Sequence, residues 1–502
     1  MARIVIVSNR VAVPTRDGDR AGGLAVVIRA GLRHHRGIWF GWSGRIAARG
    51  TTEVREIRRA GMSYLVTDLA KEDYEEYYNG FANRVLWPAL HYRLDLAEFS
   101  RRDLSSYMRV NEQFAAELQR ILTPDDLVWI HDYHLMPLAE ALRQRGQRQK
   151  IGFFLHTPMP PPDILTALPN HERLMRAMCH YDLIGFQTEN DAANFARYLA
   201  HECRLPSRDP FTFQTTERTV RLGVFPVGVE TDELNRLARR SVRSPFVREL
   251  VDSLAESSMI IGVDRLDYSK GIALRMEAFE HFLVTHPDWR GKVTYLQITP
   301  KSRSDIPEYG EMERQIGATA GRINGTYGEV SWTPIRYINR AHSRAALVGL
   351  YRSARAALVT PLRDGMNLVA KEYIAAQDFN DPGVLILSRF AGASVECQAA
   401  LIVNPYDPEA VGSTIRLALT MPLKERQARH EALMQVLRAN DIKLWADRFL
   451  EALVRPRGWR GWLQRTAGRR PSANDRPMRV PLWHGPNDPS GAVRARRPPD
   501  LD

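Results

Sequence analysis

Residues 356–372 read Ala-Ala-Leu-Val-Thr-Pro-Leu-Arg-Asp-Gly-Met-Asn-Leu-Val-Ala-Lys-Glu, and this stretch decides the fold. Its first four residues are all apolar, which is typical of a strand covered on both faces of a parallel sheet. A turn follows, and the turn opens a helix whose free N–H groups would suit a phosphate. Strand, turn and helix in this order form the repeating unit of an α/β fold.

The same unit recurs along the chain. Its apolar runs are residues 4–7, 127–130, 151–155, 183–186 and 220–225, then 259–263, 293–298, 356–359, 384–387 and 401–403. Amphipathic helical stretches such as 136–145, 191–201 and 273–284 lie between them. Alternating strands and helices imply right-handed crossovers, so we predict an α/β fold of two doubly wound, Rossmann-like domains that face each other across a cleft.

The length of 502 residues is too great for one hydrophobic core, which agrees with two domains. The two sets of apolar runs are separated by residues 226–230 and a polar stretch. We therefore predict an N-terminal domain over 1–240 and a C-terminal domain over 241–455, with the last helix returning to the first domain. Residues 204–219 are polar and contain Pro and Thr, which favours a surface excursion such as a hairpin.

The net charge of +12 is concentrated at one end of the chain. From Arg455 onward there are eleven Arg, no Lys and four Asp, so this tail carries +7. It also holds eight of the 30 prolines and lacks helix or strand periodicity. We predict that residues 456–502 are a disordered, solvated extension; a basic binding arm is the alternative. The rest of the chain has no nucleic-acid reader motif, so we expect no nucleic-acid partner.

The three cysteines, Cys179, Cys203 and Cys397, are odd in number, far apart and without metal spacing, which indicates a reducing, cytoplasmic compartment. The apolar run at the N-terminus is too short for a signal peptide or a membrane span, so we expect no membrane partner. The two Asp-x-Asp matches, at 17–19 and 500–502, lie in a polar loop and at the chain end. We therefore predict neither a metal nor a cofactor.

Polar residues follow the strands of the first half. Arg10 ends the first strand, as a ligand-binding cation or as an ordinary surface residue. The Gly22-Gly23 pair before a helix would let backbone N–H groups approach a phosphate, although a plain tight turn is the commoner explanation. His-Asp-Tyr-His at 131–134 follows another strand, either as site groups or as a cap for the next helix. Four prolines near His156 would hold that side chain in place.

Two loops of the second half carry candidates for anion binding. After the strand at 259–263, Arg265 and Lys270 suit a diphosphate, and surface salt bridges to Asp264 and Asp267 are the alternative. Lys301 and Arg303 follow the next strand. In the opening segment, Glu372 shares a helix face with Leu368, and Asp364 joins that face if the helix starts early. A carboxylate there can bind ribose hydroxyls; the alternative is that Asp364 is only a cap and Glu372 only a surface charge.

The motifs together resemble the trehalose-6-phosphate synthases, retaining glycosyltransferases of the two-domain GT-B fold. The resemblance covers residues 1 to about 455. The matching motifs are Val-Ser-Asn-Arg at 7–10, Ala-Gly-Gly-Leu at 21–24, Trp-Phe-Gly-Trp-Ser-Gly at 39–44, Tyr-Tyr-Asn at 77–79, Leu-Trp-Pro at 86–88, His-Tyr-Arg at 91–93, His-Asp-Tyr-His-Leu at 131–135, Gly-Phe-Gln-Thr at 185–188, and the segments 264–271 and 360–372.

The resemblance implies glucosyl transfer from a nucleotide-glucose to glucose 6-phosphate, with trehalose 6-phosphate as product. Residues implied on the donor are Gly22, Gly23, Arg265, Lys270, His342, Asp364, Leu368, Val369, Ala370, Lys371 and Glu372. Arg265 and Lys270 would hold the diphosphate, Asp364 the transferred glucose and Glu372 the ribose. Related chains can carry an aromatic where this chain has His342, so the base stays open: UDP-glucose is the default, with ADP- or GDP-glucose as alternatives.

Residues implied on the acceptor are Arg10, Tyr78 and Arg303 for its phosphate, Asp132 for its hydroxyls and Trp87 for its pocket. His156 would lie near the donor glucose, partly through its backbone. The implied mechanism is a front-face transfer without metal, in which the leaving phosphate takes the acceptor proton. Arg265, Lys270, His156, Asp132 and Asp364 are thus the predicted catalytic group.

Two alternatives to this function stay open. One is a synthase of the same fold with another acceptor, such as glycerol 3-phosphate or a cyclitol phosphate. The other is a catalytically silent homologue that senses sugar phosphates. Members of the family are usually homo-oligomers, so we expect a dimer or tetramer.

Overall fold

Two parallel-dominated sheets lie in the two halves of the chain, in a computed structural model that describes residues 3–13, 28, 37–47, 53–59, 61–255, 257–301 and 307–455. Within these residues the first sheet has ten strands in the order β3-β4-β2-β1-β5-β6-β7-β10-β9-β8. They are β1 (Ile4–Arg10), β2 (Gly37–Ala47), β3 (Arg55–Arg59), β4 (Met62–Ala70), β5 (Leu127–His131), β6 (Lys150–Phe154), β7 (Leu183–Phe186), β8 (Ser207–Asp209), β9 (Thr212–Gln214) and β10 (Thr219–Val224).

The centre of the first sheet is parallel and its two ends are antiparallel. Strand β1 pairs in parallel with β2 and β5, and Ile4 to Val7 of β1 are fully or almost fully buried. Strands β8 and β9 form an antiparallel hairpin beside β10, which confirms the hairpin expected within 204–219. Strands β2, β3 and β4 were not predicted, since glycines interrupt β2, β3 is mostly charged, and Ser63, Thr67 and Asp68 break up the apolar residues of β4.

The second sheet is parallel throughout the described residues, with six strands in the order β13-β12-β11-β14-β15-β16. They are β11 (Ser258–Val263), β12 (Val293–Ile298), β13 (Ile335–Ile338), β14 (Ala356–Val359), β15 (Val384–Ser388) and β16 (Leu401–Val403). This is the doubly wound order. Successive strands are added on one side of β11 up to β13, and from β14 onward they are added on its other side. The carboxyl ends of β11 and β14 mark the switch point where ligands bind in such sheets.

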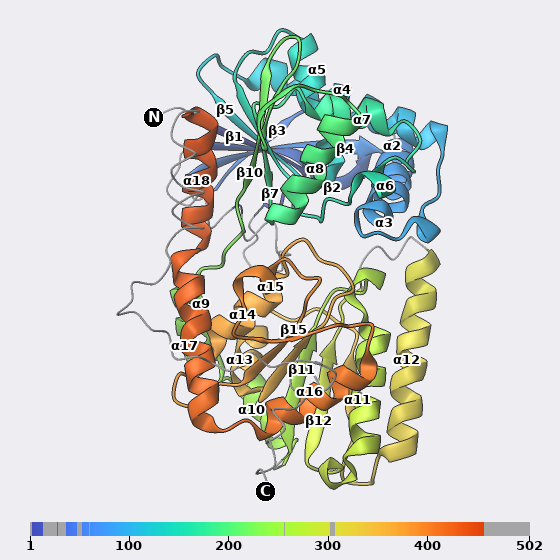
Figure 1. The fold of residues 1–502 in the computed structure, drawn as a ribbon, viewed down its shortest axis with the longest axis vertical. Helices are drawn as coiled ribbons and strands as arrows, with labels where there is room; N and C mark the ends of the chain where they lie inside the picture. Colours follow the sequence, from blue (N-terminus) through green and yellow to red (C-terminus); the bar gives the residue numbers. More distant parts are fainter. Residues whose placement is uncertain are drawn as a thin grey trace, which may run out of the picture. The chain divides into compact units, whose positions relative to one another are not determined.

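Helices connect the strands in both halves (Figure 1). In the first half they are α2 (Lys71–Asp73), the π-helix η1 (Tyr74–Leu86), α3 (Trp87–Leu90), η2 (Leu94–Leu96), α4 (Arg101–Ile121), η3 (Tyr133–Leu135), α5 (Leu138–Gln144), α6 (Pro162–Leu165), α7 (His171–Met178) and α8 (Glu189–His201). The later ones are α9 (Thr231–Ser241), α10 (Pro245–Asp252), η4 (Tyr268–Lys270), α11 (Ile272–Thr285), η5 (Pro287–Trp289), α12 (Pro307–Tyr327), α13 (Arg344–Ser353), α14 (Leu368–Ala376), α15 (Ala393–Glu396), α16 (Pro408–Thr420), α17 (Leu423–Ala439) and α18 (Ile442–Val454).

The two sheets have separate apolar cores. One core is built around β1, β5 and α4, and the other around β11, β12 and α11. Helix α11 packs on α12 and α16, while α13 packs on α9, α10 and α14, so helices cover both faces of the second sheet (Figure 1). The fold is therefore α/β with two Rossmann-like sheets, as predicted.

The chain passes between the halves twice. The first passage is at 226–230, after β10, and helix α9 then packs on α13 and α14 of the second half. The predicted division at residue 240 falls inside α9, and it stays a prediction about independent domains. The second passage leads into α18, which lies against β6 and β7 of the first sheet (Figure 1). There Trp445 and Phe449 contact the ring of Trp129, with ring centroids 4.8 Å and 4.5 Å away.

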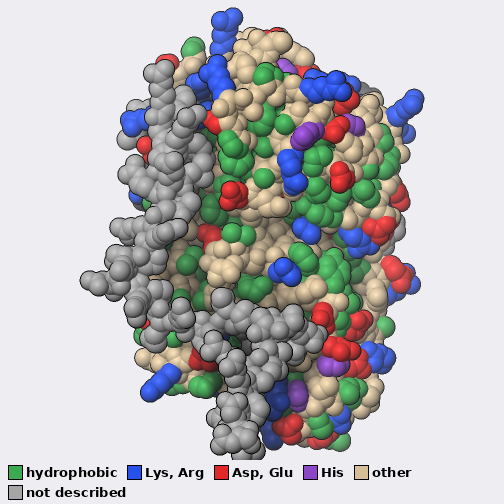
Figure 2. All heavy atoms as spheres, in the orientation of Figure 1, with side chains coloured by type: hydrophobic (Ala, Val, Ile, Leu, Met, Phe, Trp, Pro, Cys, Tyr) green, Lys and Arg blue, Asp and Glu red, His purple; other side chains and the backbone are tan. Residues whose placement is uncertain are grey.

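Charge on the visible surface is mixed. On the face that Figure 2 shows, Lys and Arg side chains of the described residues are interspersed with Asp and Glu side chains. Among the same residues, no helix is both long enough and apolar enough to cross a membrane. The predicted extension at 456–502 lies outside the residues that the structure describes.

Candidate active site

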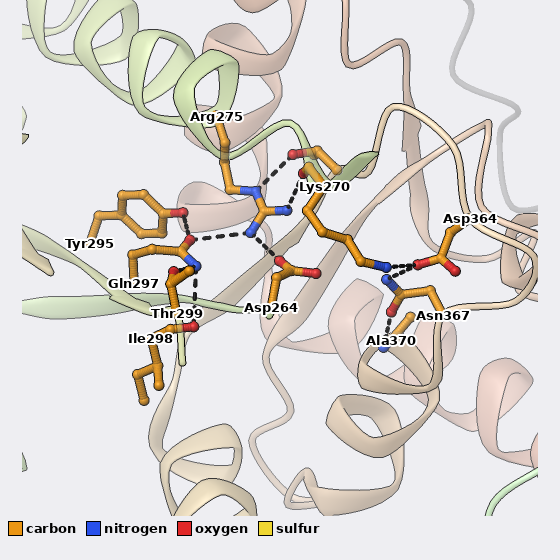
Figure 3. Close-up of polar contacts among 11 residues, drawn as sticks. Asp264, Lys270, Arg275, Tyr295, Gln297, Ile298, Thr299, Asp364, Asn367 and Ala370 are labelled. Atoms are coloured by element: carbon orange, nitrogen blue, oxygen red, sulfur yellow. Dashed lines mark hydrogen bonds and ion pairs between the residues drawn. The ribbon is translucent and has the colours of Figure 1, made fainter. Parts of the chain in front are cut away.

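The loops that follow β11 and β14 meet at the switch point of the second sheet. Lys270 donates from Nζ to Oδ2 of Asp364 over 2.5 Å, although 94 positions separate the two residues (Figure 3). Burial alone would raise the pKa of Asp364, but the Lys270 ammonium lowers it below the ordinary value. The backbones are joined as well, since Leu362 N–H donates to the Ser269 carbonyl over 2.7 Å. A carboxylate and an ammonium are thus held together where a ligand would bind.

This arrangement removes two alternatives that the sequence left open. Lys270 pairs with Asp364 and not with Asp264 or Asp267. Asp364 is not the cap of helix α14, because Asn367 has that role: its Oδ1 accepts from Ala370 N–H over 3.1 Å. Asn367 also donates to Asp364 over 3.1 Å and adopts a left-handed backbone with φ of 78°.

The first turn of α14 offers backbone and carboxylate groups together. Leu368 and Val369 are half-buried at the helix start, and Ala370 is buried. Glu372 lies one turn in; burial raises the pKa of its carboxyl, and Arg344 acts in the opposite direction. Among the described residues, no hydrogen bond to the Glu372 carboxylate is found. A half-buried acceptor is what a ribose would need, and the role of Glu372 toward a ribose stays a prediction.

Lys371 does not join this group with its side chain. Its Nζ donates to the Val227 carbonyl over 2.7 Å and pairs with Glu396 at 2.5 Å. The side chain is 2% exposed and faces the first passage between the halves. Within the predicted donor set, Lys371 can therefore offer only its backbone to a ligand, because its charge is already neutralised by Glu396.

Arg265 is exposed beside an aromatic ring of the first half. Its guanidinium carbon lies 5.8 Å from the centre of the Trp87 ring. Trp87 also donates from Nε1 to Oδ1 of Asp267 over 3.4 Å. In the described part of the chain, Arg265 pairs with no carboxylate, so its charge is available to an anion. The acceptor residue Trp87 and the donor residue Arg265 are thus neighbours.

At the edge of the first sheet, Asp132 and His156 are linked. Asp132 has a left-handed backbone, with φ of 76°, which is uncommon for a residue other than glycine. Its Oδ1 accepts from the backbone N–H of His156 over 3.3 Å. Its side chain does not cap the following helix η3. The Asp132 side chain is therefore oriented by the loop that carries His156, and the capping interpretation is wrong.

The histidines at this edge are kept neutral. Burial lowers the pKa of His156 to about 3, and the ring nitrogens of His131 and His156 lie 3.1 Å apart. Burial also lowers the pKa of His91 to about 4, although Asp267 opposes that shift. His91 Nδ1 lies 2.7 Å from the Trp87 carbonyl, which can only accept, so Nδ1 carries the proton.

Arg10 and Tyr78 are brought together by Trp42. The Arg10 guanidinium carbon lies 5.8 Å from the Trp42 ring centre, and the Tyr78 ring centre lies 5.5 Å from it. Tyr78 also stacks on His134, with centroids 5.8 Å apart. Tyr78 belongs to η1, and π-helices of this kind are frequent at functional sites. An exposed cation and a phenol therefore share one aromatic platform.

Contacts cross between the two edges. A Cβ built on Gly365 would lie 2.1 Å from the His156 carbonyl oxygen, so only glycine fits there. Arg363 lies 3.8 Å above the ring of Tyr92, and Arg93 in turn lies 5.7 Å from the ring of Tyr268. Loops of the two halves that carry predicted residues are therefore in contact.

Four predicted residues are not placed in this group. Gly22, Gly23 and Arg303 lie outside the described residues. His342 lies before α13 beside Phe246, with ring centres 5.2 Å apart, and its Nε2 is buried without a partner among the residues described. No contact of His342 with the other donor candidates is found in that part of the chain. In addition, no described group of three or more His, Cys, Asp or Glu side chains could hold a metal ion.

Comparison with known proteins identifies the group to which these features belong. The model of glycosyltransferase family 20 matches residues 3–455. The chain belongs to glycosyltransferase family 20. A family 20 relative, the trehalose-6-phosphate synthase of Sinorhizobium fredii, is 50% identical over 457 residues, which are 90% of this chain and 98% of that protein.

Solved structures agree with the family 20 assignment. An α,α-trehalose-phosphate synthase (UDP-forming) from Burkholderia xenovorans, in complex with glucose-6-phosphate, is 45% identical with a TM-score of 0.88, covering 90% of this chain and all of that one. An E. coli structure described as bound with UDP-2-fluoro glucose is 44% identical with a TM-score of 0.85, covering 90% of this chain and 99% of that one. The fold is therefore GT-B.

Two residues of this family 20 site were not assigned from the sequence. His91 lies in a quoted motif, but it follows a helix, where no strand end marks it. Arg275 lies inside the apolar stretch that opens α11, where a lone Arg suggests an exposed face. Both are buried in the structure.

Proposed function

We propose that this chain transfers a glucosyl group from UDP-glucose to glucose 6-phosphate and forms α,α-trehalose 6-phosphate and UDP. One observation carries the proposal: Arg265, predicted for the donor, pairs with no carboxylate of the described residues and lies beside Trp87, predicted for the acceptor. Relatives across 90% of the chain are trehalose-6-phosphate synthases. Two similar structures hold glucose-6-phosphate and a UDP-2-fluoro glucose.

The donor is held by the second half. Arg265 and Lys270 neutralise the diphosphate, and the backbone N–H groups of Leu368 and Val369 add the positive end of α14. The Glu372 carboxylate accepts from the ribose hydroxyls, and Asp364 accepts from hydroxyls of the transferred glucose. When the diphosphate binds, Lys270 is shared between it and Asp364. This keeps Asp364 ionised and close to the glucose.

The acceptor is held by the first half. Arg10 and Tyr78 take its phosphate with Arg303, and Asp132 takes its hydroxyls. The backbone N–H of His156 donates to the Asp132 carboxylate. This hydrogen bond holds the group that binds the acceptor hydroxyls next to the loop that faces the donor glucose. Trp87 covers the sugars with its ring. Holding both reactants in this way supplies the orientation that a bimolecular transfer lacks in water.

The transfer itself is front-face. The bond between glucose C1 and the diphosphate oxygen breaks, and a bond to the acceptor hydroxyl forms on the same face. The leaving diphosphate oxygen takes the hydroxyl proton. The leaving oxygen gains negative charge, and the cations of Arg265 and Lys270 lower the barrier because they are in place beside it before the reaction starts. His91 and His156 stay neutral at pH 7 and do not compete for that proton.

The test is release of nucleoside diphosphate by the purified protein. UDP-, ADP- and GDP-glucose are each supplied with glucose 6-phosphate, with and without a chelator. We expect UDP release that requires glucose 6-phosphate, survives chelation and yields a non-reducing phosphorylated disaccharide. Release only with glycerol 3-phosphate or a cyclitol phosphate would assign another acceptor. Binding without any release would identify a silent sensor.

We also propose a cytoplasmic location and a homo-oligomeric state. Cys179, Cys203 and Cys397 are buried and free, which suits a reducing compartment. Fractionation of cells tests the location. Light scattering of the purified chain tests the oligomer, and a monomer mass at working concentration would contradict it.

A further inference from the structure

Arg275 is a fully buried cation beneath the donor loops. It lies near the start of α11, with a side chain 0% exposed, and pairs with Asp264 at 2.6 Å. The same guanidinium donates to the Thr360 hydroxyl over 2.9 Å, to the Gln297 amide oxygen over 3.2 Å and to the Lys270 carbonyl over 3.1 Å (Figure 3). These partners come from the ends of β11, β12 and β14 and from the loop before α11.

Each partner is adjacent to a group that the proposed reaction uses. Lys270 is held through its carbonyl, while its ammonium reaches Asp364. Asp264 directly precedes Arg265 in the chain. Thr360 begins the loop that carries Asp364. One rigid, planar group therefore fixes both the loop whose cations receive the diphosphate and the loop that carries Asp364.

The surroundings are built for a guanidinium. A Cβ on Gly262 would lie 2.4 Å from the Gln297 amide oxygen and 2.9 Å from Arg275 Nη1, so glycine leaves the space that the cluster fills. Gln297 is oriented in turn, since it donates to the Thr299 hydroxyl over 2.9 Å and accepts from the Tyr295 hydroxyl. A buried charge is tolerated only when its hydrogen bonds are satisfied in this way.

The charge of this cluster is stable. Burial works against the cation, but Asp264 raises the pKa of Arg275 above its ordinary value. Lysine at this position could not replace the guanidinium, because an ammonium is a compact point charge and cannot donate along four fixed directions. The geometry of the partners therefore requires arginine, and not only a positive charge.

We propose that Arg275 is a positioning residue for the transfer, which sets Arg265 and Lys270 against the donor diphosphate without touching it. The proposal rests on the proposed function only in that the donor is a nucleoside diphosphate sugar. Because Arg275 acts through the donor loops, its loss affects donor binding and turnover and leaves the acceptor site intact.

The test compares Arg275→Lys with a matched control, Arg143→Lys. Arg143 is also an arginine of low exposure, with a side chain 9% exposed and an aspartate partner, Asp182 at 2.9 Å, but it lies in α5, away from the candidate site. For Arg275→Lys we expect UDP affinity and turnover to fall by about tenfold each, as a small misplacement of catalytic groups does, with KM for glucose 6-phosphate unchanged. For Arg143→Lys we expect lower stability with turnover per folded molecule and both KM values unchanged.

Two outcomes would overturn the proposal. One is an Arg275→Lys protein with wild-type UDP affinity and turnover. The other is a loss in which Arg275→Lys and Arg143→Lys change the same parameters to the same extent, which would indicate a purely structural role.

A second variant carries the test if Arg275→Lys does not fold. Thr360→Val removes one of the four acceptors of Arg275 and leaves the Arg275–Asp264 pair in place. Arg275 Nε–H then has no acceptor, and we expect UDP affinity to fall about threefold. Unchanged affinity for UDP in Thr360→Val would then overturn the proposal. UDP titration needs no acceptor, so it decides the role of Arg275 even if glucose 6-phosphate proves to be the wrong substrate.

Discussion

The carboxyl edges of the two sheets differ in the charge of their polar side chains: neutral histidine rings lie at the first edge, and ion pairs lie at the second. At the edge of the first sheet, His91 and His131 are buried and His156 is half-buried, and loss of solvation lowers the pKa of each, so these rings are neutral at pH 7. At the edge of the second sheet there are two ion pairs instead: Arg275 with Asp264 is fully buried, and Lys270 with Asp364 is largely buried. The difference is not one of burial, since each edge combines buried side chains with half-buried and exposed ones.

The difference follows the chemistry that each edge serves. In the proposed function the second edge faces the diphosphate, where negative charge grows as the bond to glucose breaks, and fixed charges with little exposure to water act strongly there. The first edge faces hydroxyl groups, which are bound best by neutral donors and acceptors. Its cation for the acceptor phosphate, Arg10, is kept exposed. Substitutions at the two edges and beside them separate these roles.

The largest effect concerns a buried ion pair away from the reacting groups. Lys371→Met leaves the Glu396 carboxylate and the Val227 carbonyl without their shared donor. Breaking a buried pair on one side costs about 3 kcal/mol or more. We expect that loss in the free energy of unfolding, measured with urea. The double variant Lys371→Met/Glu396→Leu should recover part of it, and a loss below about 1 kcal/mol would show that the pair is not a structural tie.

Arg265→Ala asks whether charge at the second edge drives the reaction. Removal of one stabiliser of the leaving group should lower turnover by about a hundredfold or more, which corresponds to about 3 kcal/mol. Because Arg265 is exposed, its removal should hardly change the free energy of unfolding. Steady-state kinetics check this.

Arg93→Ala is the matched control for that experiment. Arg93 also lies near an aromatic ring of the opposite half, Tyr268, but Asp95 already neutralises it. Its loss should change turnover only slightly. Near-normal turnover in Arg265→Ala would refute the charge-based account of the second edge.

His91→Gln tests whether His91 at the first edge is held uncharged, through the pH dependence of the free energy of unfolding. His91 has a pKa of about 4 when folded, against about 6.5 when unfolded, so between these values the unfolded chain binds more protons. Its contribution to stability is complete above pH 6.5 and is lost as the pH falls toward 4. From pH 7 to pH 5 this loss is about 2 kcal/mol, and His91→Gln should show that much less acid destabilisation in urea unfolding. Parallel curves for the two proteins would mean that His91 is not held neutral.

Tyr78→Phe gives the smallest effect. The variant keeps the ring that stacks on His134 and loses only the hydroxyl. One hydrogen bond to a charged phosphate is worth about 1.5 kcal/mol, so KM for glucose 6-phosphate should rise about tenfold. KM for UDP-glucose should stay the same, because the donor is held by the other edge. An equal rise in both values would place Tyr78 outside the acceptor site.

Much of the fold could be predicted from apolar runs, and the exceptions have physical reasons. Strands β7, β12, β14 and β16 begin and end where the runs do, because both faces of the sheet are covered. Strand β13 was missed because it is an edge strand, in which only alternate residues need to be apolar. Strand β2 was missed because glycines interrupt its aromatic residues.

The site was predictable where a strand end marks it. Arg265, Lys270 and Asp364 all follow strands, so the sequence places them at the edge of the sheet. Their pairing was not predictable, because Lys270 takes a partner 94 positions away instead of the nearby Asp264 or Asp267. Arg275 could not be found, since its role arises from partners on three separate strands.

The low exposure of both ion pairs at the second edge also determines how substrate binding responds to salt. Mobile ions screen charges beyond a Debye length of about 8 Å at 0.15 M, but they cannot enter between groups packed in the interior. Added salt therefore acts on Arg10 and Arg265, which are exposed, and hardly on Lys270, Asp364, Arg275 and Asp264. Rising ionic strength should weaken the capture of both anionic substrates while the alignment of those already bound persists.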